Sequence, residues 1–247
     1  MHAISRMFKA FLARTAVVCA LIFMPAALPA ETYYVSTAGS DTNSGIGGWA
    51  NAKQTIAAAL ALAAAPGDTV WLSNGTHVLE GELSVNSGII LQGYTTNAED
   101  TEIDGGYPDR TNRCLTINHQ DARVANLTVR NGYYPVDGGG GGGIYINAGG
   151  MVSNCLVISN FCIRLGAGIH VAANGRITDS RIIANRTAHS GFAQGGVYIC
   201  TPTAWWKDAW LPATTPTAAA GSASKKTARL PTPASKAIFH ISTAAGS

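Results

Sequence analysis

Short runs in which apolar and polar residues alternate fill the chain between residues 67 and 200. A period of two predicts strands, because successive side chains of a strand point to opposite faces. Residues 53–65 (KQTIAAALALAAA) carry the one convincing helical pattern, since they are rich in strong helix formers and end before Pro66 and Gly67. The pattern therefore predicts one helix, preceded by a short strand at 32–35. It is followed almost entirely by short strands, the first of them at 69–72, 88–91, 115–117 and 127–129.

The apolar runs recur as an internal repeat. Gly143-Ile144-Tyr145-Ile146 returns as Gly168-Ile169-His170-Val171 after 25 residues, and as Gly196-Val197-Tyr198-Ile199 after a further 28. Residues 152–160 match residues 177–185, again with an offset of 25. Strands this short cannot bury an apolar face alone, whereas copies stacked about 4.8 Å apart pair each strand in parallel with its equivalent. The expected fold class is all-β, a parallel β-helix (solenoid) with an N-terminal capping α-helix.

Alternation within each copy assigns its side chains to the interior or to the outside. The residues expected to face inward are Ile144, Ile146, Ile169, Val171, Val197 and Ile199. The residues between them form an outward column with one member per copy: Thr116, Tyr145, His170 and Tyr198. Corner positions are expected at Asn154 and Asp179, and at Asn160 and Asn185, because Asn tolerates a left-handed φ and can stack its amide on the next copy. The glycine run 138–143 is expected to form a corner or a loop.

The first 30 residues have the pattern of a secretory signal peptide. Arg6, Lys9 and Arg14 form a basic start, residues 15–28 form an apolar run, and Ala30 supplies a small residue at the expected cleavage point before Glu31. A membrane anchor is the alternative, but it needs about 20 apolar residues. We therefore expect an exported protein that is extracellular, at the cell surface or in the cell envelope, with no transmembrane segment in the mature chain.

Residues 201–247 differ from the repeat in composition. They contain two glycines, against 15 in residues 131–200, and 30 of the 47 residues are Ala, Thr, Pro or Ser. One interpretation is a disordered Pro/Thr linker. The interpretation that we favour is translation out of frame, because a shifted reading of residues 205–211 permits Val-Glu-Gly-Cys-Leu-Val, close to residues 152–157. The chain would then be a truncated product whose last copy exposes a parallel edge.

The formal net charge of +3 comes from the two ends of the chain. Residues 31–200 contain 9 Lys and Arg against 13 Asp and Glu, and they show no basic stripe. A mildly acidic body argues against nucleic acid as a partner. Four cysteines lie outside the leader, namely Cys114, Cys155, Cys162 and Cys200. A chain of this length and apolar content does not need a disulfide framework, so we expect buried single thiols.

Several motifs resemble those of the pectate-lyase-like right-handed parallel β-helix superfamily. They are Tyr33-Tyr-Val-Ser, residues 39–45, the helix, Gly67-Asp-Thr-Val-Trp-Leu and Asn74-Gly-Thr76. The Gly-Gly-Ile-Tyr and Asn-Cys-x-Val-x-x-Asn segments also resemble repeats of polymorphic outer-membrane proteins and bacterial surface β-helices. The resemblance covers residues 33–200 and implies the fold, but it leaves the activity open because lyases, hydrolases and adhesins share it.

Candidate chemistry is sparse. Tyr145, His170 and Tyr198 are candidates for glycan contact, since stacked rings pack against sugars, although a tyrosine on a solvent face is also simply a good strand former. Lyase chemistry would need carboxylates converging on Ca²⁺. The acidic segment 99–104 and the pair Asp179 and Arg181 do not repeat in adjacent copies as such a site requires. We therefore assign no catalytic residue, no metal ligand and no cofactor, with Ca²⁺ implied only by a lyase.

The sequence divides into a signal peptide (1–30), an N-terminal strand, turn and cap helix (31–66), the repeat (67–200) and the low-complexity tail (201–247). The expected function is that of an exported cell-surface or secreted β-helix with a structural, adhesive or glycan-contacting role. A polysaccharide or a cell-surface glycan is the expected partner. The alternative is a fragment of a polysaccharide lyase or glycoside hydrolase whose active site lies in missing copies of the repeat.

Overall fold

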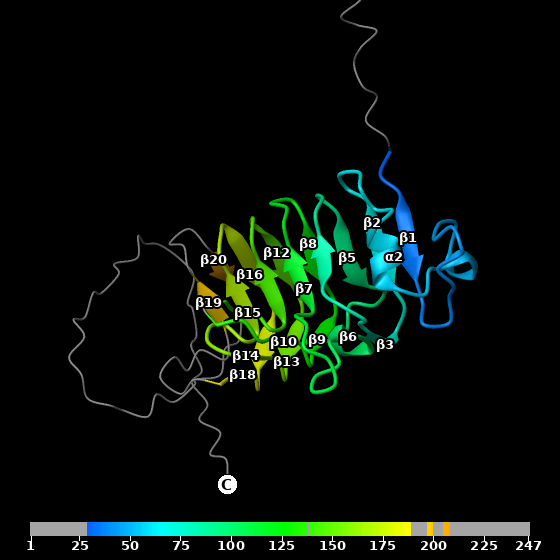
Figure 1. The fold of residues 1–247 in the computed structure, drawn as a ribbon. Helices are drawn as coiled ribbons and strands as arrows, with labels where there is room; N and C mark the ends of the chain where they lie inside the picture. The colour runs from blue at the N-terminus through cyan, green and yellow to red at the C-terminus, as the bar shows by residue number, and fades with distance from the viewer. Residues whose placement is uncertain (1–28, 138, 189–196, 200–204, 208–247) are drawn as a thin grey trace, which may run out of the picture.

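The computed structural model describes residues 29–137, 139–188, 197–199 and 205–207 (Figure 1). Within these residues the chain is predominantly β, every strand pair is parallel, and helix is limited to a few short turns. The predicted signal peptide at 1–30 and the predicted tail at 201–247 lie outside the described residues, apart from positions 29–30 and 205–207. The predominance of β-structure is therefore confirmed for the part of the chain between them.

The described strands form four parallel sheets, in which successive strands pair in the following order. Sheet A contains β1 (Thr32–Val35), β2 (Thr69–Leu72), β5 (Ile90–Gly93), β8 (Arg123–Ala125), β12 (Gly150–Ser153), β16 (Gly175–Thr178) and β20 (Trp205–Lys207). Sheet B contains β3 (Gly75–Val78), β6 (Thr101–Asp104), β9 (Thr128–Arg130), β13 (Leu156–Ile158) and β17 (Arg181–Ile183). Sheet C contains β4 (Leu83–Val85), β7 (Leu115–Ile117), β11 (Ile144–Ile146), β15 (Ile169–Val171) and β19 (Val197–Ile199). Sheet D contains β10 (Tyr133–Tyr134), β14 (Phe161–Cys162) and β18 (Arg186–Thr187).

The repeat in the sequence becomes the register between strands. Ile144 pairs with Ile169, and Ile169 pairs with Val197, so the copies predicted from the sequence lie directly beside one another. The chain visits the sheets in a fixed order, and each visit adds a strand next to the equivalent strand of the previous copy, as the advance of the strands in Figure 1 shows. The predicted parallel pairing of successive copies is confirmed.

The apolar members of these strands form one continuous core. Ile144, Ile146 and Ile169 are fully buried, and Val171 is 1 % exposed, as the period-two alternation predicts. The thiols of Cys114, Cys155 and Cys162 are buried and free. Burial raises the pKa of Cys155 to about 12, because a thiolate would be poorly solvated there. The expectation of buried single thiols is confirmed for these three cysteines, whereas Cys200 lies outside the described residues.

Polar corners join sheets A and B. Asn126, Asn154 and Asp179 have φ of 57°, 48° and 51°, a left-handed conformation that Asn and Asp tolerate better than most residues. The Asn154 Nδ2 donates to Asn126 Oδ1 at 3.0 Å, so the amides of successive copies are linked. The predicted corner role is confirmed for Asn154 and Asp179.

The second predicted corner is displaced by one residue. Ser159 and Ala184 take the left-handed conformation, with φ of 57° and 52°, so the prediction of a left-handed φ at Asn160 and Asn185 is wrong. These two asparagines are buried instead, and Asn160 Nδ2 donates to Asn185 Oδ1 at 2.9 Å. The amide thus satisfies buried polar groups of the neighbouring copy, and the bend itself is taken by the residue before it.

The predicted helix at 53–65 is much shorter in the structure, where α2 spans Ile56–Leu60. The Asp41 carboxylate accepts hydrogen bonds from the backbone amides of Gln54 and Thr55, at 2.8 Å each, and this holds the preceding segment outside the helix. Thr55 then caps the first turn, since its Oγ1 accepts from the Ala58 amide at 3.2 Å. The helix packs against β1, β2 and β4. Figure 1 shows it beside β1 and β2. Two 3₁₀ turns complete the helical content of the described residues, η1 (Trp49–Asn51) and η2 (Ala98–Asp100).

Candidate functional site

The outer face of sheet C brings the predicted glycan-contact residues into one column. Ser84 of β4 pairs with Thr116, Thr116 with Tyr145, and Tyr145 with His170. His170 in turn pairs with Tyr198 of β19, whose backbone alone is described. The predicted alignment of Tyr145, His170 and Tyr198 is therefore confirmed as a backbone register.

The expectation that this whole column faces solvent is wrong. Thr116 and His170 are each 6 % exposed, while Tyr145 is half-buried. The glycine run, expected to form a corner or a loop, lies against His170 at Gly140 and Gly141, so closely that a Cβ on Gly140 would collide with His170 Nδ1 and with the Leu165 carbonyl. Glycine is required at this position because the backbone itself covers the imidazole.

Arg113 fixes the glycine run over sheet C. Its Nε donates to the Gly141 carbonyl at 2.6 Å, and its Nη2 donates to the Gly140 carbonyl at 2.8 Å. Its Nη1 lies 3.1 Å from Glu82 Oε1 and 3.0 Å from Thr116 Oγ1. Arg113 is 6 % exposed and its donors face acceptors on three sides, so its guanidinium binds loop, strand and carboxylate together.

Two tyrosine rings enclose the same guanidinium. The Arg113 Cζ lies 4.1 Å from the ring centroid of Tyr134 and 4.6 Å from that of Tyr145, both within the range of cation–π attraction. Tyr145 also meets the His170 ring edge-to-face, with centroids 5.1 Å apart. Both tyrosines are half-buried, so each keeps part of its surface in contact with solvent.

His170 is neutral at physiological pH. Burial and the nearby Arg113 charge together lower the pKa of His170 to about 4, because both disfavour a second positive charge under the loop. Thr116 Oγ1 also forms a close hydrogen bond with Glu82. The face therefore combines one permanent cation, one partly exposed carboxylate and a neutral imidazole.

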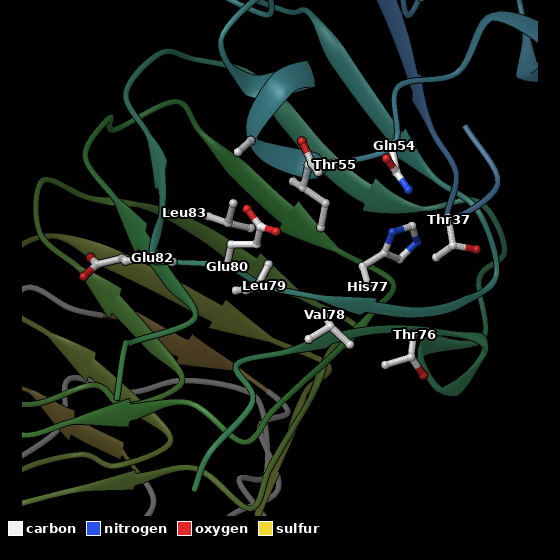
Figure 2. A pocket seen from close by; sticks show the side chains of 13 residues that line it. Thr37, Gln54, Thr55, Thr76, His77, Val78, Leu79, Glu80, Glu82 and Leu83 are labelled. Carbon is white, nitrogen blue, oxygen red and sulfur yellow. The ribbon is translucent and has the colours of Figure 1, made fainter. Parts of the chain in front are cut away.

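A pocket of about 430 Å³ continues from Glu82 toward α2 (Figure 2). Thr37, Gln54 and Thr55 line one side of it, and the segment 76–83 lines the other. Figure 2 shows Glu82 at the end of the pocket remote from His77 and pointing away from it. Glu82 therefore lines this end of the pocket and also takes part in the Arg113 cluster.

His77, in the same pocket, is a structural residue. It is 4 % exposed, and its Nε2 lies 2.9 Å from the Ser73 carbonyl. Burial lowers the pKa of His77, although the hydrogen bond to Ser73 opposes that shift. The ring thus satisfies a backbone carbonyl of its own strand connection as a neutral donor.

Sequence reasoning missed Arg113, Glu82 and Tyr134. Glu82 directly precedes β4, and Arg113 lies two residues before β7, the strand with which β4 pairs. Their separation of 31 residues is close to the repeat length, so a search for opposite charges at that interval would have found the pair.

The acidic segment considered for a lyase is held in ion pairs on sheet B. Arg130 Nη2 lies 3.1 Å from Glu102 Oε2, and Arg130 Nε lies 3.0 Å from Asp104 Oδ2. Asp104 also accepts from the Asn131 amide at 3.1 and 3.0 Å. These carboxylates neutralise a cation and order the corner after β9, so they act within the fold.

The second pair considered for a lyase does not form. Arg181 pairs with Glu99 at 3.1 Å, while Asp179 occupies a corner. Within the residues that the structure describes, no group of three or more His, Cys, Asp and Glu side chains is arranged to hold a metal ion.

Comparison with protein-family models, curated proteins and solved structures finds no match to this chain. In the described part of the chain, no helix combines the length and the apolar character needed to cross a membrane. The functional interpretation therefore depends on the geometry of the sheet C face.

Proposed function

We propose that the chain is a right-handed parallel β-helix of the pectate-lyase-like kind, exported from the cell, with a glycan-contacting face. The all-parallel sheets, the regular visits of the chain to each sheet and the register between Ile144 and Ile169 support this fold. The linked amides of Asn126 and Asn154 at successive corners support it as well.

Export is supported by the contacts of the residue that would follow the cleavage point. β1 starts at Thr32, and the Glu31 amide donates to Asp68 Oδ1 at 2.8 Å, so the expected cleavage after Ala30 would leave this contact intact. N-terminal sequencing of the protein recovered outside the cytoplasm of an expressing bacterium should therefore begin at Glu31. Recovery of an uncleaved chain inside the cell would contradict export.

The observation that carries glycan contact is the Arg113 guanidinium held between two half-exposed tyrosines and beside Glu82. Aromatic rings pack against the C–H faces of sugars, while a partly exposed carboxylate such as that of Glu82 accepts hydrogen bonds from hydroxyls. Arg113 also locks the rings of Tyr134 and Tyr145 in place, so a ligand would meet a preorganised surface and lose less free energy in ordering it.

Binding of soluble oligosaccharides tests this proposal. A panel of neutral and acidic plant and bacterial oligosaccharides is titrated into the purified chain by isothermal calorimetry. Tyr145→Ala should weaken binding roughly tenfold, the loss expected when about 1.4 kcal/mol of ring contact is removed. The matched control is Tyr94→Ala, since Tyr94 is 55 % exposed and follows sheet A instead. Failure of every oligosaccharide to bind, or equal losses in both variants, would refute a glycan site at sheet C.

The alternative function is that of a polysaccharide lyase or glycoside hydrolase. The lowered pKa of His170 beside a buried Arg113 favours it, because perturbed titrations gather at catalytic sites. Incubation of the same oligosaccharides with the chain, with and without added Ca²⁺, tests for unsaturated products by absorbance and for new reducing ends. Product formation that His170→Gln abolishes would rank catalysis above binding.

A further inference from the structure

A second cluster of rings lies on sheet D, on the opposite side from Arg113. Tyr133 of β10 pairs with Phe161 of β14, and Phe161 pairs with Arg186 of β18. Tyr134 stacks on Arg113, so its neighbour Tyr133, one residue earlier in the same strand, points to the other face. The Tyr133, Phe161 and Arg186 column is therefore separate from the sheet C face.

Tyr107 completes this cluster from the loop after β6. Its ring centroid lies 5.0 Å from that of Tyr133 and 5.6 Å from that of Phe161, and the Tyr107 and Phe161 planes are 19° apart. Tyr133 and Phe161 are 5.1 Å apart. Tyr107 is 38 % exposed and Phe161 is half-buried, so the stacked pair keeps an accessible apolar surface.

A pocket of about 400 Å³ lies beside these rings and is lined by Tyr107, Phe161 and Arg186 and by the corners 159–160 and 184–185. The side-chain amides of Asn160 and Asn185 are buried and bonded to the backbone and to each other. They anchor the pocket but leave little capacity for a ligand.

Arg186 is the cation of this pocket. It is exposed and takes part in no ion pair with any residue that the structure describes. Four other arginines of the described chain, Arg113, Arg130, Arg164 and Arg181, are each paired with a carboxylate. A guanidinium that forms no ion pair within the described residues, in a pocket that Tyr107 and Phe161 also line, is complementary to an anionic group carried on a ring with an apolar face.

We propose that this pocket binds an acidic sugar residue of a glycan, with the sugar ring against Phe161 and Tyr107 and its carboxylate on Arg186. The proposal rests on the glycan-contacting function and adds a second site, on sheet D, with its own charge preference. A polysaccharide that bears carboxylates at intervals would then engage sheet C and sheet D from either side of the covering loop, and two linked contacts strengthen binding by raising effective concentration.

A matched pair of ligands tests the proposal. The full chain is titrated with a β-1,4-linked glucose oligosaccharide and with the same oligosaccharide oxidised at C6 to carboxylates, at low ionic strength. The native chain should bind the oxidised ligand about tenfold more tightly, as expected for one charge-assisted contact. Added salt should reduce that preference, because the Arg186 contact is exposed and therefore screened.

Two arginine variants locate the charge preference. Arg186→Gln should make the two affinities equal, whereas Arg176→Gln should leave the preference unchanged. Arg176 is the matched control because it is exposed on sheet A, is likewise without an ion pair in the described residues, and carries the same charge. Phe161→Leu should weaken binding of the oxidised ligand, and unfolding followed by circular dichroism verifies that each variant is folded.

The outcomes separate this site from the sheet C face. Equal binding of both ligands, with Tyr145→Ala still weakening them, would overturn the sheet D site and leave the glycan-contacting function standing. Equal losses of preference in Arg186→Gln and Arg176→Gln would also overturn it, since the attraction would then be a property of total charge. If neither ligand binds, and the Tyr145→Ala variant gives the same titration as the native chain, both proposals would be overturned.

Discussion

Replacement of Arg113 by methionine should destabilise the protein far more than loss of a surface charge. The side chain is buried and donates to the carbonyls of Gly140 and Gly141, to Thr116 and to Glu82. Methionine fills much of the same volume but cannot donate a hydrogen bond. The variant therefore isolates the polar contacts from the packing of the aliphatic stem.

The size of the destabilisation depends on which hydrogen-bond partners of Arg113 can be hydrated after the substitution. The side chain of Glu82 is 34 % exposed, so its carboxylate rehydrates and its ion pair contributes little. Gly140 and Gly141 are buried, and each carbonyl left without a donor costs about 1–2 kcal/mol. The expected loss of unfolding free energy is thus roughly 2–4 kcal/mol, most of it from the two carbonyls.

Urea unfolding followed by circular dichroism measures this loss as a lower midpoint at an unchanged slope. The control is Arg123→Met on sheet A, where the side chain is exposed and no ion pair is formed within the described residues; it should change stability by no more than about 0.5 kcal/mol. The pKa of His170, followed by NMR, should rise in Arg113→Met because one of the two causes of its depression is gone. Equal midpoints for the two variants would refute the view that Arg113 holds the glycine run.

Two further predictions concern buried polar groups. Because the pKa of His170 is lowered from 6.5 to about 4, the unfolded chain binds this proton first as the pH falls. The free energy of unfolding should therefore decline between pH 6.5 and pH 4, by up to about 3 kcal/mol. In a His170→Gln variant the melting temperature should depend less on pH over that range. Asn160→Ala should cost about 2–3 kcal/mol in urea unfolding, since the Val129 carbonyl and the Gly132 amide lose a buried partner. Asn118→Ala, at an exposed amide contact, should cost less than about 1 kcal/mol, and equal costs would contradict this account.

The pairing of strands could be predicted from the sequence, because each strand pairs with the equivalent strand one repeat away. The offset of 25 residues between Ile144 and Ile169 is also their register, and the predicted strands at 69–72 and 115–117 have the bounds found in the structure. The strand predicted at 88–91 instead begins at Ile90, because the Ile89 amide bonds to the Ser87 carbonyl in a turn. Boundaries were harder to predict because turn bonds act within two or three residues and leave no mark in the apolar pattern.

Burial of the outer column could not be predicted in the same way. The alternation of apolar and polar residues correctly places His170 on the outer face of its strand. A residue on that face is exposed to solvent only where no other segment covers it, and His170 is buried. His170 is covered by the glycine run, which lies between two strands. This run has no apolar periodicity from which its position could be predicted. Long insertions between repeats must therefore be placed by their contacts, and here the contact that places the insertion is Arg113.

Residues that break the repeat are the best guide to function in this chain. Counting back two residues from the paired positions Leu115, Ile144 and Ile169 gives Arg113, Gly142 and Ala167, so only one copy carries a charge there. A packing role common to all copies would require similar residues at equivalent positions, as it does for the buried isoleucines. Arg186 departs in the same way, since it follows Tyr133 and Phe161 in a column that is otherwise aromatic. Arg113 lies between two tyrosine rings, and Arg186 lines a pocket together with Tyr107 and Phe161. This shared combination of a guanidinium with aromatic rings is why we assign ligand contact to these two places.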